Sequence, residues 1–218
     1  MAQTLESQVR ILISGSTNGV TTEVPQDYIY DFLTAGAEHV IKMVPKELLI
    51  PFSAETSIPD GGLALSGLRL SGLISVRVGD NICREVPVSR KGKLTDSESL
   101  FYVRAGTKNP VFYKFNGRVY VAPLASGAAF AQHVYLADVA SAVTSLMGEL
   151  DDAIVYYAAS LASKSLYSYR VEVDEDMELA GLHKNSAQEF LQAATLSVQS
   201  YLSGKGLSTQ PNASQQGG

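Results

Sequence analysis

Two helical stripes of apolar side chains, separated by about a hundred residues of strand-like sequence, constrain the fold of this 218-residue chain most strongly. Between Ile29 and Val44, and again between Leu150 and Tyr169, apolar or small residues recur at steps of one, three or four. That spacing places them on one face of a 3.6-residue helix. Because each helix must bury its stripe, we expect the two helices to pack against each other. The segment between them is then predicted to be an inserted β module.

Prolines bound the first of these helices, which we predict over residues 25–44. Pro25 suits the first helical position, where its missing N–H is not needed. Pro45 ends the helix, because the residue before a proline is pushed out of the α region. Ahead of this helix, we expect residues 3–13 to be helical, with a strand as the alternative, and Ser14–Thr22 to form a loop.

From about residue 50 to residue 138 the sequence has the pattern of strands and turns. Leu73–Val78 alternates apolar and polar residues, as a half-buried strand does. In Val111–Pro123, aromatic and β-branched residues flank Asn116-Gly117, a pair that tolerates positive φ and predicts a tight β-hairpin. Two further strands are expected, at Ile82–Val88 and at His133–Leu136. Residues 93–98 are expected to form one helical turn. Together these strands predict one antiparallel sheet of about four to six strands.

Helical sequence returns near Ser145 and runs to about Tyr169. The acidic run 172–178 then begins another helix, because the helix dipole favours anions at its start. This last helix should reach about Leu202 and end at the glycines that follow, Gly204 and Gly206.

These elements predict an α+β fold, with an antiparallel β module inserted into a bundle of three to four helices. The bundle is expected to comprise residues 1–49 and 139–203, and the β domain residues 50–138. Residues 204–218 are polar, with almost nothing to bury, and are expected to form a flexible tail.

Composition and charge narrow the class of protein. Apolar residues make up 45% of the chain, enough for a core that needs no disulfide or metal. The single cysteine, Cys83, cannot form an internal bridge, which fits a reducing compartment, and we expect it to be a buried strand thiol. The net charge of −5 argues against general nucleic-acid binding, which depends on Lys and Arg. Without a signal-peptide pattern or a long apolar run, we expect synthesis in a cytoplasm and no membrane partner.

No residue pattern indicates catalysis. The three histidines are far apart and lack partners at a metal-ligand spacing, so we expect ordinary surface or boundary positions for His39, His133 and His183. Asp151 and Asp152 point about 100° apart on a helix, so they suit the helix start and cannot flank one bond as paired catalytic carboxylates. We therefore expect no enzyme activity, no catalytic residue, no cofactor and no metal.

Two charged segments each have two interpretations. The acidic run 172–178 is either a solvated helix entry or a negative rim that meets a basic partner. The densest basic stretch is either a charged strand edge that discourages aggregation or a surface facing DNA or an acidic partner. That stretch contains Arg84, Arg90, Lys91 and Lys93.

The helix that ends near Tyr169 has a second apolar face. Val155 and Ala159 join Tyr156 off the main stripe, and Tyr167 also lies off it. A helix that is apolar on two faces is covered on both sides. The second face meets either a third helix of the same chain, which residues 178–202 could supply, or a neighbouring subunit, since tyrosine is favoured at interfaces. In the second alternative, the residues of the subunit interface are Tyr156, Val155, Ala159 and Tyr167.

Four segments carry a resemblance to a known family: the helix DYIYDFLTAGAEHVIKMVPKELL, the strand sequence VGDNICREVPVSRKGKL, the hairpin PVFYKFNGRVYVAP and the helix ELDDAIVYYAASLASKSL. Through them, over roughly residues 25–202, the chain resembles the neck proteins of tailed bacteriophages, which are the head-to-tail adaptor or connector proteins. The resemblance implies a small helical bundle that carries a β insertion. It has no catalytic residue to carry over.

The resemblance also implies partners and a location. It implies a homo-oligomer, commonly a ring of twelve subunits, bound to the portal protein on one side and to the tail or a second neck protein on the other. DNA would pass through its channel without sequence recognition, and the protein would lie in the neck of the virion. A polar tail of this kind is expected to dock on the portal, with Leu207, Gln210, Pro211 and Asn212 as its candidate residues.

Other functions remain as alternatives. Within the same class, the chain could be another virion ring component, such as a tail terminator. From a different class, the β module could bind a ligand or carbohydrate, which requires exposed aromatic residues on one strand face. The residues to check are Phe112, Tyr113, Phe115 and Tyr120. An enzyme is the third alternative and would need a cleft that gathers polar residues.

Overall fold

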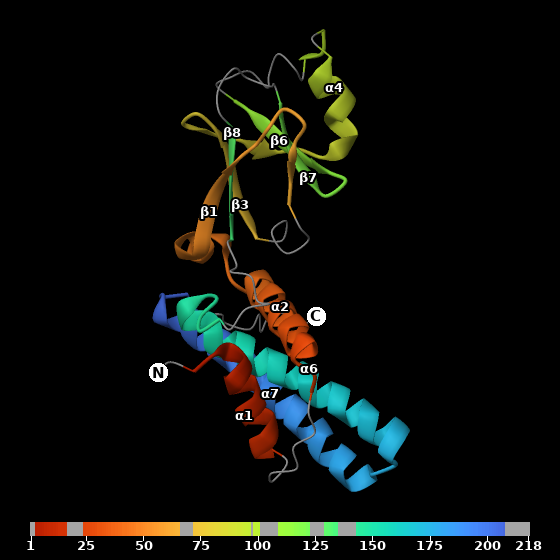
Figure 1. Cartoon of the computed structure of the whole chain (residues 1–218). Helices are drawn as coiled ribbons and strands as arrows, with labels where there is room; N and C mark the ends of the chain where they lie inside the picture. The colour runs from red at the N-terminus through yellow and green to blue at the C-terminus, as the bar shows by residue number, and fades with distance from the viewer. Residues whose placement is uncertain are drawn as a thin grey trace, which may run out of the picture. The chain divides into compact units, whose positions relative to one another are not determined.

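The computed structural model describes residues 3–16, 24–65, 72–96, 98–100, 109–122, 129–134 and 143–207 (Figure 1). The chain divides into two compact units, one formed by residues 1–44 and 136–218 and the other by residues 45–135. We call them the helical unit and the β unit, because the strands of the described residues all lie in the second. The predicted α+β class is confirmed.

The helical unit is built around one central helix. Four α-helices make up its described part: α1 (Leu5–Ser16), α2 (Gln26–Met43), α6 (Asp151–Tyr169) and α7 (Met177–Gly204). Helix α6 packs against each of the other three (Figure 1). A short 3-10 turn, Gly148–Leu150, precedes α6, and a π-helical turn, Arg170–Asp174, joins it to α7.

Small side chains let the neighbouring helices approach α6 closely. Its buried residues are Ala153, Ile154, Val155, Ala158, Ala159, Ser160, Ala162, Ser163 and Leu166. Against α7, the Ser160 hydroxyl donates a hydrogen bond to the Ala187 carbonyl at 2.8 Å. Against α2, Gly36 lies so close that an added Cβ would be 2.8 Å from the Ile154 carbonyl oxygen. The first predicted stripe is thereby confirmed, since α2 buries Ile29, Leu33, Gly36, Ala37, Val40 and Ile41.

Local chemistry sets the ends of the last helix. The Asp176 carboxylate caps α7 by accepting a hydrogen bond from the Leu179 backbone N–H at 3.0 Å. At the other end, α7 stops at Gly204, and Gly206 adopts a φ of +79°. The predicted acidic entry and glycine stop are both confirmed.

Two four-stranded sheets form the described part of the β unit. The first has the order β1-β8-β3-β4, and all its pairs are antiparallel: β1 (Ser53–Ser57), β8 (Ala129–Val134), β3 (Leu73–Val78) and β4 (Asn81–Ile82). The second has the order β2-β7-β6-β5: β2 (Leu63–Ala64), β7 (Arg118–Ala122), β6 (Val111–Phe115) and β5 (Arg84–Glu85). Within the second sheet, β5 runs parallel to β6.

The two sheets share one core. Residues of both lie in a single cluster: Leu65, Leu73, Val76, Val78, Cys83, Phe112, Val119, Val121 and Ala131. The other side of the second sheet is covered as well, because Leu94 of the short helix α4 (Lys91–Thr95) packs with Val86, Val111, Tyr113 and Ala122. Another 3-10 turn, Val88–Arg90, leads into α4.

The expected single antiparallel sheet is wrong, because the chain changes sheets at Cys83. The Cys83 N–H donates to Val76 of the first sheet at 2.7 Å, whereas the next N–H, that of Arg84, donates to Pro110 at 3.1 Å. The predicted strand Ile82–Val88 is therefore split into β4 and β5, followed by a 3-10 turn.

Other boundaries differ less from the expectations. The hairpin is confirmed, with Phe115 paired to Arg118 across Asn116 and Gly117, whose φ values are 48° and 70°. The first helix of the chain is confirmed as well, but α1 continues to Ser16, into the expected loop. A 3-10 helix, Lys46–Phe52, follows α2. The helical turn predicted at 93–98 is present as α4, which begins two residues earlier, at Lys91, and ends at Thr95. The strand expected at His133–Leu136 is β8, which ends at Val134; residues 17–23 and 135–142 lie outside the described part.

Candidate interaction surfaces

Two of the four predicted interface residues are buried by the chain itself. Val155 and Ala159 of α6 have almost no exposed surface, whereas Tyr156 and Tyr167 are half-buried. Helix α1 covers the Val155 side of α6, so the second apolar face is filled largely within the chain. The subunit interface itself stays a prediction, and only the two tyrosines retain surface for it.

An open hollow of about 230 Å³ lies between α1 and α6. Val155 and Tyr156 line it together with Ile11 and Leu12 of α1. Ile11 is an exposed apolar residue at this hollow, and no interface role was predicted for it from the sequence. The hollow is therefore the place where the predicted tyrosine surface meets a second helix.

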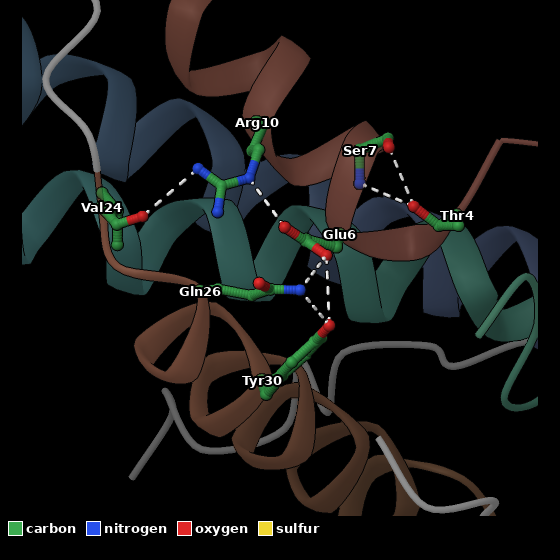
Figure 2. Close-up of polar contacts among 7 residues, drawn as sticks. All are labelled: Thr4, Glu6, Ser7, Arg10, Val24, Gln26 and Tyr30. Atoms are coloured by element: carbon green, nitrogen blue, oxygen red, sulfur yellow. Dashed lines mark hydrogen bonds and ion pairs between the residues drawn. The ribbon is translucent and has the colours of Figure 1, made fainter. Parts of the chain in front are cut away.

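A polar network fixes α1 against the start of α2 (Figure 2). The Glu6 carboxylate accepts hydrogen bonds from Arg10 Nε at 2.9 Å, Gln26 Nε2 at 3.0 Å and the Tyr30 hydroxyl at 3.2 Å. Arg10 also donates to the Val24 carbonyl at 3.3 Å. Because charge-assisted hydrogen bonds of this kind are directional, they hold α1 in the position that shapes the hollow.

At the turn between α6 and α7, exposed apolar side chains are surrounded by acidic residues. Tyr169, Val173 and Met177 expose 48%, 61% and 67% of their surface there. The acidic residues around them are exposed too: Glu172, Glu175, Asp176 and Glu178. We call these seven residues the hairpin tip. The acidic rim was one of the two predicted interpretations of the run 172–178; the apolar centre was missed, since Tyr169 was expected to be on the buried stripe.

A surface of opposite charge lies on the β unit. Val88 and Phe115 are exposed apolar residues, and the Lys91 Nζ lies 4.4 Å from the centre of the Phe115 ring. Basic side chains on the same segments complete what we call the basic patch: Val88, Arg90, Lys91, Lys93, Phe115 and Arg118. Arg84, the remaining residue of the predicted basic stretch, is exposed on β5.

Charge is divided unevenly between the two units. Residues 1–44 and 136–218 contain fifteen Asp and Glu against six Lys and Arg, a net charge of −9. Residues 45–135 contain seven Asp and Glu against eleven Lys and Arg, a net charge of +4. The net charge of −5 is therefore the sum of one negatively charged unit and one positively charged unit. Units of opposite charge favour electrostatic association between copies of the chain.

Only part of the predicted docking tail is described. Leu207 is exposed, and its backbone N–H donates to the Leu202 carbonyl at 3.0 Å. Gln210, Pro211 and Asn212 lie outside the described residues.

Two histidines are in the core, so the predicted surface or boundary position is wrong for both. His133 on β8 is buried, and its Nδ1 lies 3.0 Å from the Val134 carbonyl, which can only accept a hydrogen bond. Nδ1 therefore donates, and in the neutral ring Nε2 accepts from the Thr56 hydroxyl at 2.9 Å. These two hydrogen bonds satisfy both nitrogens of the buried imidazole ring.

His183 on α7 is fully buried, and neither ring nitrogen has a hydrogen-bond partner among the residues that the structure describes. Burial lowers its pKa, and the positive charge of Arg170 lowers that pKa further. The third histidine, His39, is half-buried and stacks on Tyr157 with ring centres 4.1 Å apart. Helical periodicity could have placed His183 on the buried face of α7, three residues after Ala180 and four before Ala187.

Cys83 and the acidic pair occupy the positions expected of them. Cys83 is buried between the sheets, and desolvation raises the pKa of its thiol to about 11. Asp151 lies at the start of α6, where its carboxylate accepts hydrogen bonds from the backbone N–H groups of Leu146 at 2.9 Å and Met147 at 2.6 Å.

Within the described residues, no group of three or more His, Cys, Asp and Glu could hold a metal ion.

The aromatic residues of the hairpin do not form an exposed platform. Phe112 and Tyr113 are buried, and Tyr120 stacks on Tyr113 with ring centres 5.2 Å apart. Of the four aromatic residues that a carbohydrate site would use, Phe115 is the exposed one. This arrangement gives the carbohydrate-binding alternative no support.

No protein-family model and no curated protein matches this sequence. Among the described residues, none of the helices is long and apolar enough to cross a membrane.

Proposed function

We propose that this protein is a structural component of a bacteriophage neck, a head-to-tail adaptor that assembles as a ring between the portal and the tail. The observation that carries the proposal is apolar surface left over after the helical unit has closed around α6. Tyr169, Val173 and Met177 remain exposed at the hairpin tip, and Ile11 remains exposed beside the hollow between α1 and α6. Exposed apolar groups that cluster in this way are typical of surfaces that other chains cover.

The distribution of charge supports a role around DNA without sequence recognition. The helical unit carries a net charge of −9. A channel lined by such a surface repels phosphates and lets DNA slide, whereas a cationic lining would hold the phosphates. We propose that acidic residues of the helical unit contribute to the channel and that the ring contains about twelve copies, as the family resemblance implies.

Co-purification with the portal protein encoded in the same genome tests the proposal. The tagged portal should retain this protein at a ratio of about one chain per portal subunit, as measured by gel densitometry of the purified complex, because the two rings stack on one axis. A protein that never binds the portal, and that instead binds glycans on an array, would favour the binding-module alternative.

A further inference from the structure

We infer that the hairpin tip of one copy docks on the basic patch of a second copy, in a head-to-tail contact. The inference deepens the proposed ring assembly and rests on it, because it names the two surfaces through which neighbouring subunits meet. Both surfaces have an apolar centre and a charged rim, and the rims have opposite sign.

The hairpin tip has the features of one half of an interface. Its three apolar residues lie within nine positions of the chain, at the end of a helical hairpin where the bundle no longer covers them. A π-helical turn, Arg170–Asp174, shapes it, and such turns occur frequently at functional sites. Glu172, Glu175 and Glu178 form no ion pair with any residue in the described part of the chain. Their charges therefore remain available to a basic partner.

The basic patch has the complementary features. The 3-10 turn Val88–Arg90 and helix α4 present its basic residues beside the end of the β6–β7 hairpin, to which Lys91 is joined by its contact with Phe115. Val88, three residues before Lys91 in the chain, and Phe115, beneath the Lys91 ammonium, are its exposed apolar residues. A basic rim around an apolar centre matches an acidic rim around Tyr169, Val173 and Met177 in both polarity and charge.

The two surfaces differ, so a contact between them is heterologous. A heterologous contact repeated from copy to copy closes into a ring when its rotation fits, and this is the symmetry that a neck requires. Individual exposed ion pairs contribute little to affinity. We therefore assign the affinity mainly to the apolar centres, and the choice of partner and orientation to the charges.

Charge reversal tests this contact on the full-length chain. One variant reverses the tip (Glu172→Lys with Glu178→Lys), and another reverses the patch (Arg90→Glu with Lys93→Glu). A matched control for the tip variant, Asp31→Lys with Glu189→Lys, makes the same change of +4 in net charge at exposed positions of α2 and α7 outside the tip. Sedimentation velocity measures the assembly state of each, and circular dichroism checks that each variant remains folded.

We expect the wild type and the control to associate, and each reversed variant to lose at least tenfold in self-affinity because like charges then face each other. An equimolar mixture of the two reversed variants should associate again, because a basic tip then meets an acidic patch and an acidic tip meets a basic patch. Such recovery cannot come from misfolded protein. Association of the wild type should also weaken as salt is raised.

Three results would overturn the contact: a wild type that stays monomeric at 100 μM, reversed variants that associate like the control, or a mixture that stays monomeric. Portal co-purification separates this failure from a failure of the proposed function. If the wild type binds the portal but the tip and patch variants assemble normally, the proposed contact is refuted. The proposed neck function is then still supported.

Discussion

A Cβ added to Gly36 of α2 would lie 2.8 Å from the carbonyl oxygen of Ile154 on α6. The two residues are separated by the whole β unit in sequence, yet their backbones come close enough that only glycine fits. This contact is where the two predicted stripes meet. It therefore reports whether the helices on either side of the insertion form one bundle.

Replacing Gly36 by alanine should destabilise the helical unit. The added methyl group meets a backbone oxygen, which cannot rotate away, and overpacking of this kind costs about 1–3 kcal/mol. Gly181→Ala is the matched control, because its Cβ would have open space within α7 and alanine is the better helix former by about 1 kcal/mol. Urea unfolding followed by circular dichroism should show opposite shifts in midpoint. Equal shifts would refute the close approach.

His183 should make the stability of the helical unit depend on pH. Burial and Arg170 lower the pKa of the folded-state imidazole below its ordinary value of 6.5. Below pH 6.5 the unfolded chain takes up a proton at this position that the folded chain does not. The free energy of unfolding should therefore fall with decreasing pH, by up to about 1.4 kcal/mol per pH unit, until the folded-state pKa is reached.

The variant His183→Met isolates this effect, because an apolar side chain of similar length fills the site without titrating. Urea unfolding at pH 7.5 and pH 5.5 should show a smaller loss for this variant than for the wild type. The pKa of His39 is also lowered, by burial and then by Lys42, so His39→Gln is the comparison that keeps the His183 contribution. A loss in His183→Met as large as in the wild type would exclude His183 as the cause.

Thr56→Val should destabilise the β unit. It removes the hydroxyl that donates to His133 Nε2 at 2.9 Å and leaves a buried acceptor without a partner. A buried unsatisfied group costs about 1–3 kcal/mol. Thr56→Ser keeps the hydroxyl and should lose markedly less stability in thermal unfolding; similar losses in both variants would mean that the hydrogen bond contributes little.

Helical periodicity predicted the packing faces of α2 and α6, because a stripe that must be buried fixes which side of a helix faces inward. It could not predict that Tyr169 lies beyond the end of the bundle, since that depends on how far α6 extends past its neighbours. Nor could it predict the change of sheet at Cys83, where β4 and β5 are two residues each and carry no periodic signal. Periodicity also left open whether a helix of the same chain or a neighbouring subunit covers the second face of α6; Val155 and Ala159 are buried within the chain, and α1 packs against α6.

Truncation after Leu207 should weaken binding to the portal without unfolding the protein. The shortened chain keeps the Lys205–Glu149 ion pair at 3.1 Å and the Leu207 hydrogen bond to Leu202. We expect its thermal midpoint to stay within about 2 °C of the wild type, since no described contact is lost. Portal affinity, measured by biolayer interferometry, should fall at least tenfold. Unchanged affinity would remove the tail from the proposed docking surface.

Electron microscopy of the protein bound to its portal tests the central proposal most directly. Class averages should show a closed collar on one end of the portal, with an open centre wide enough for duplex DNA, and a rotational symmetry of about twelve. Particles in which the portal carries no added density, or carries isolated copies that never close into a collar, would contradict a neck protein.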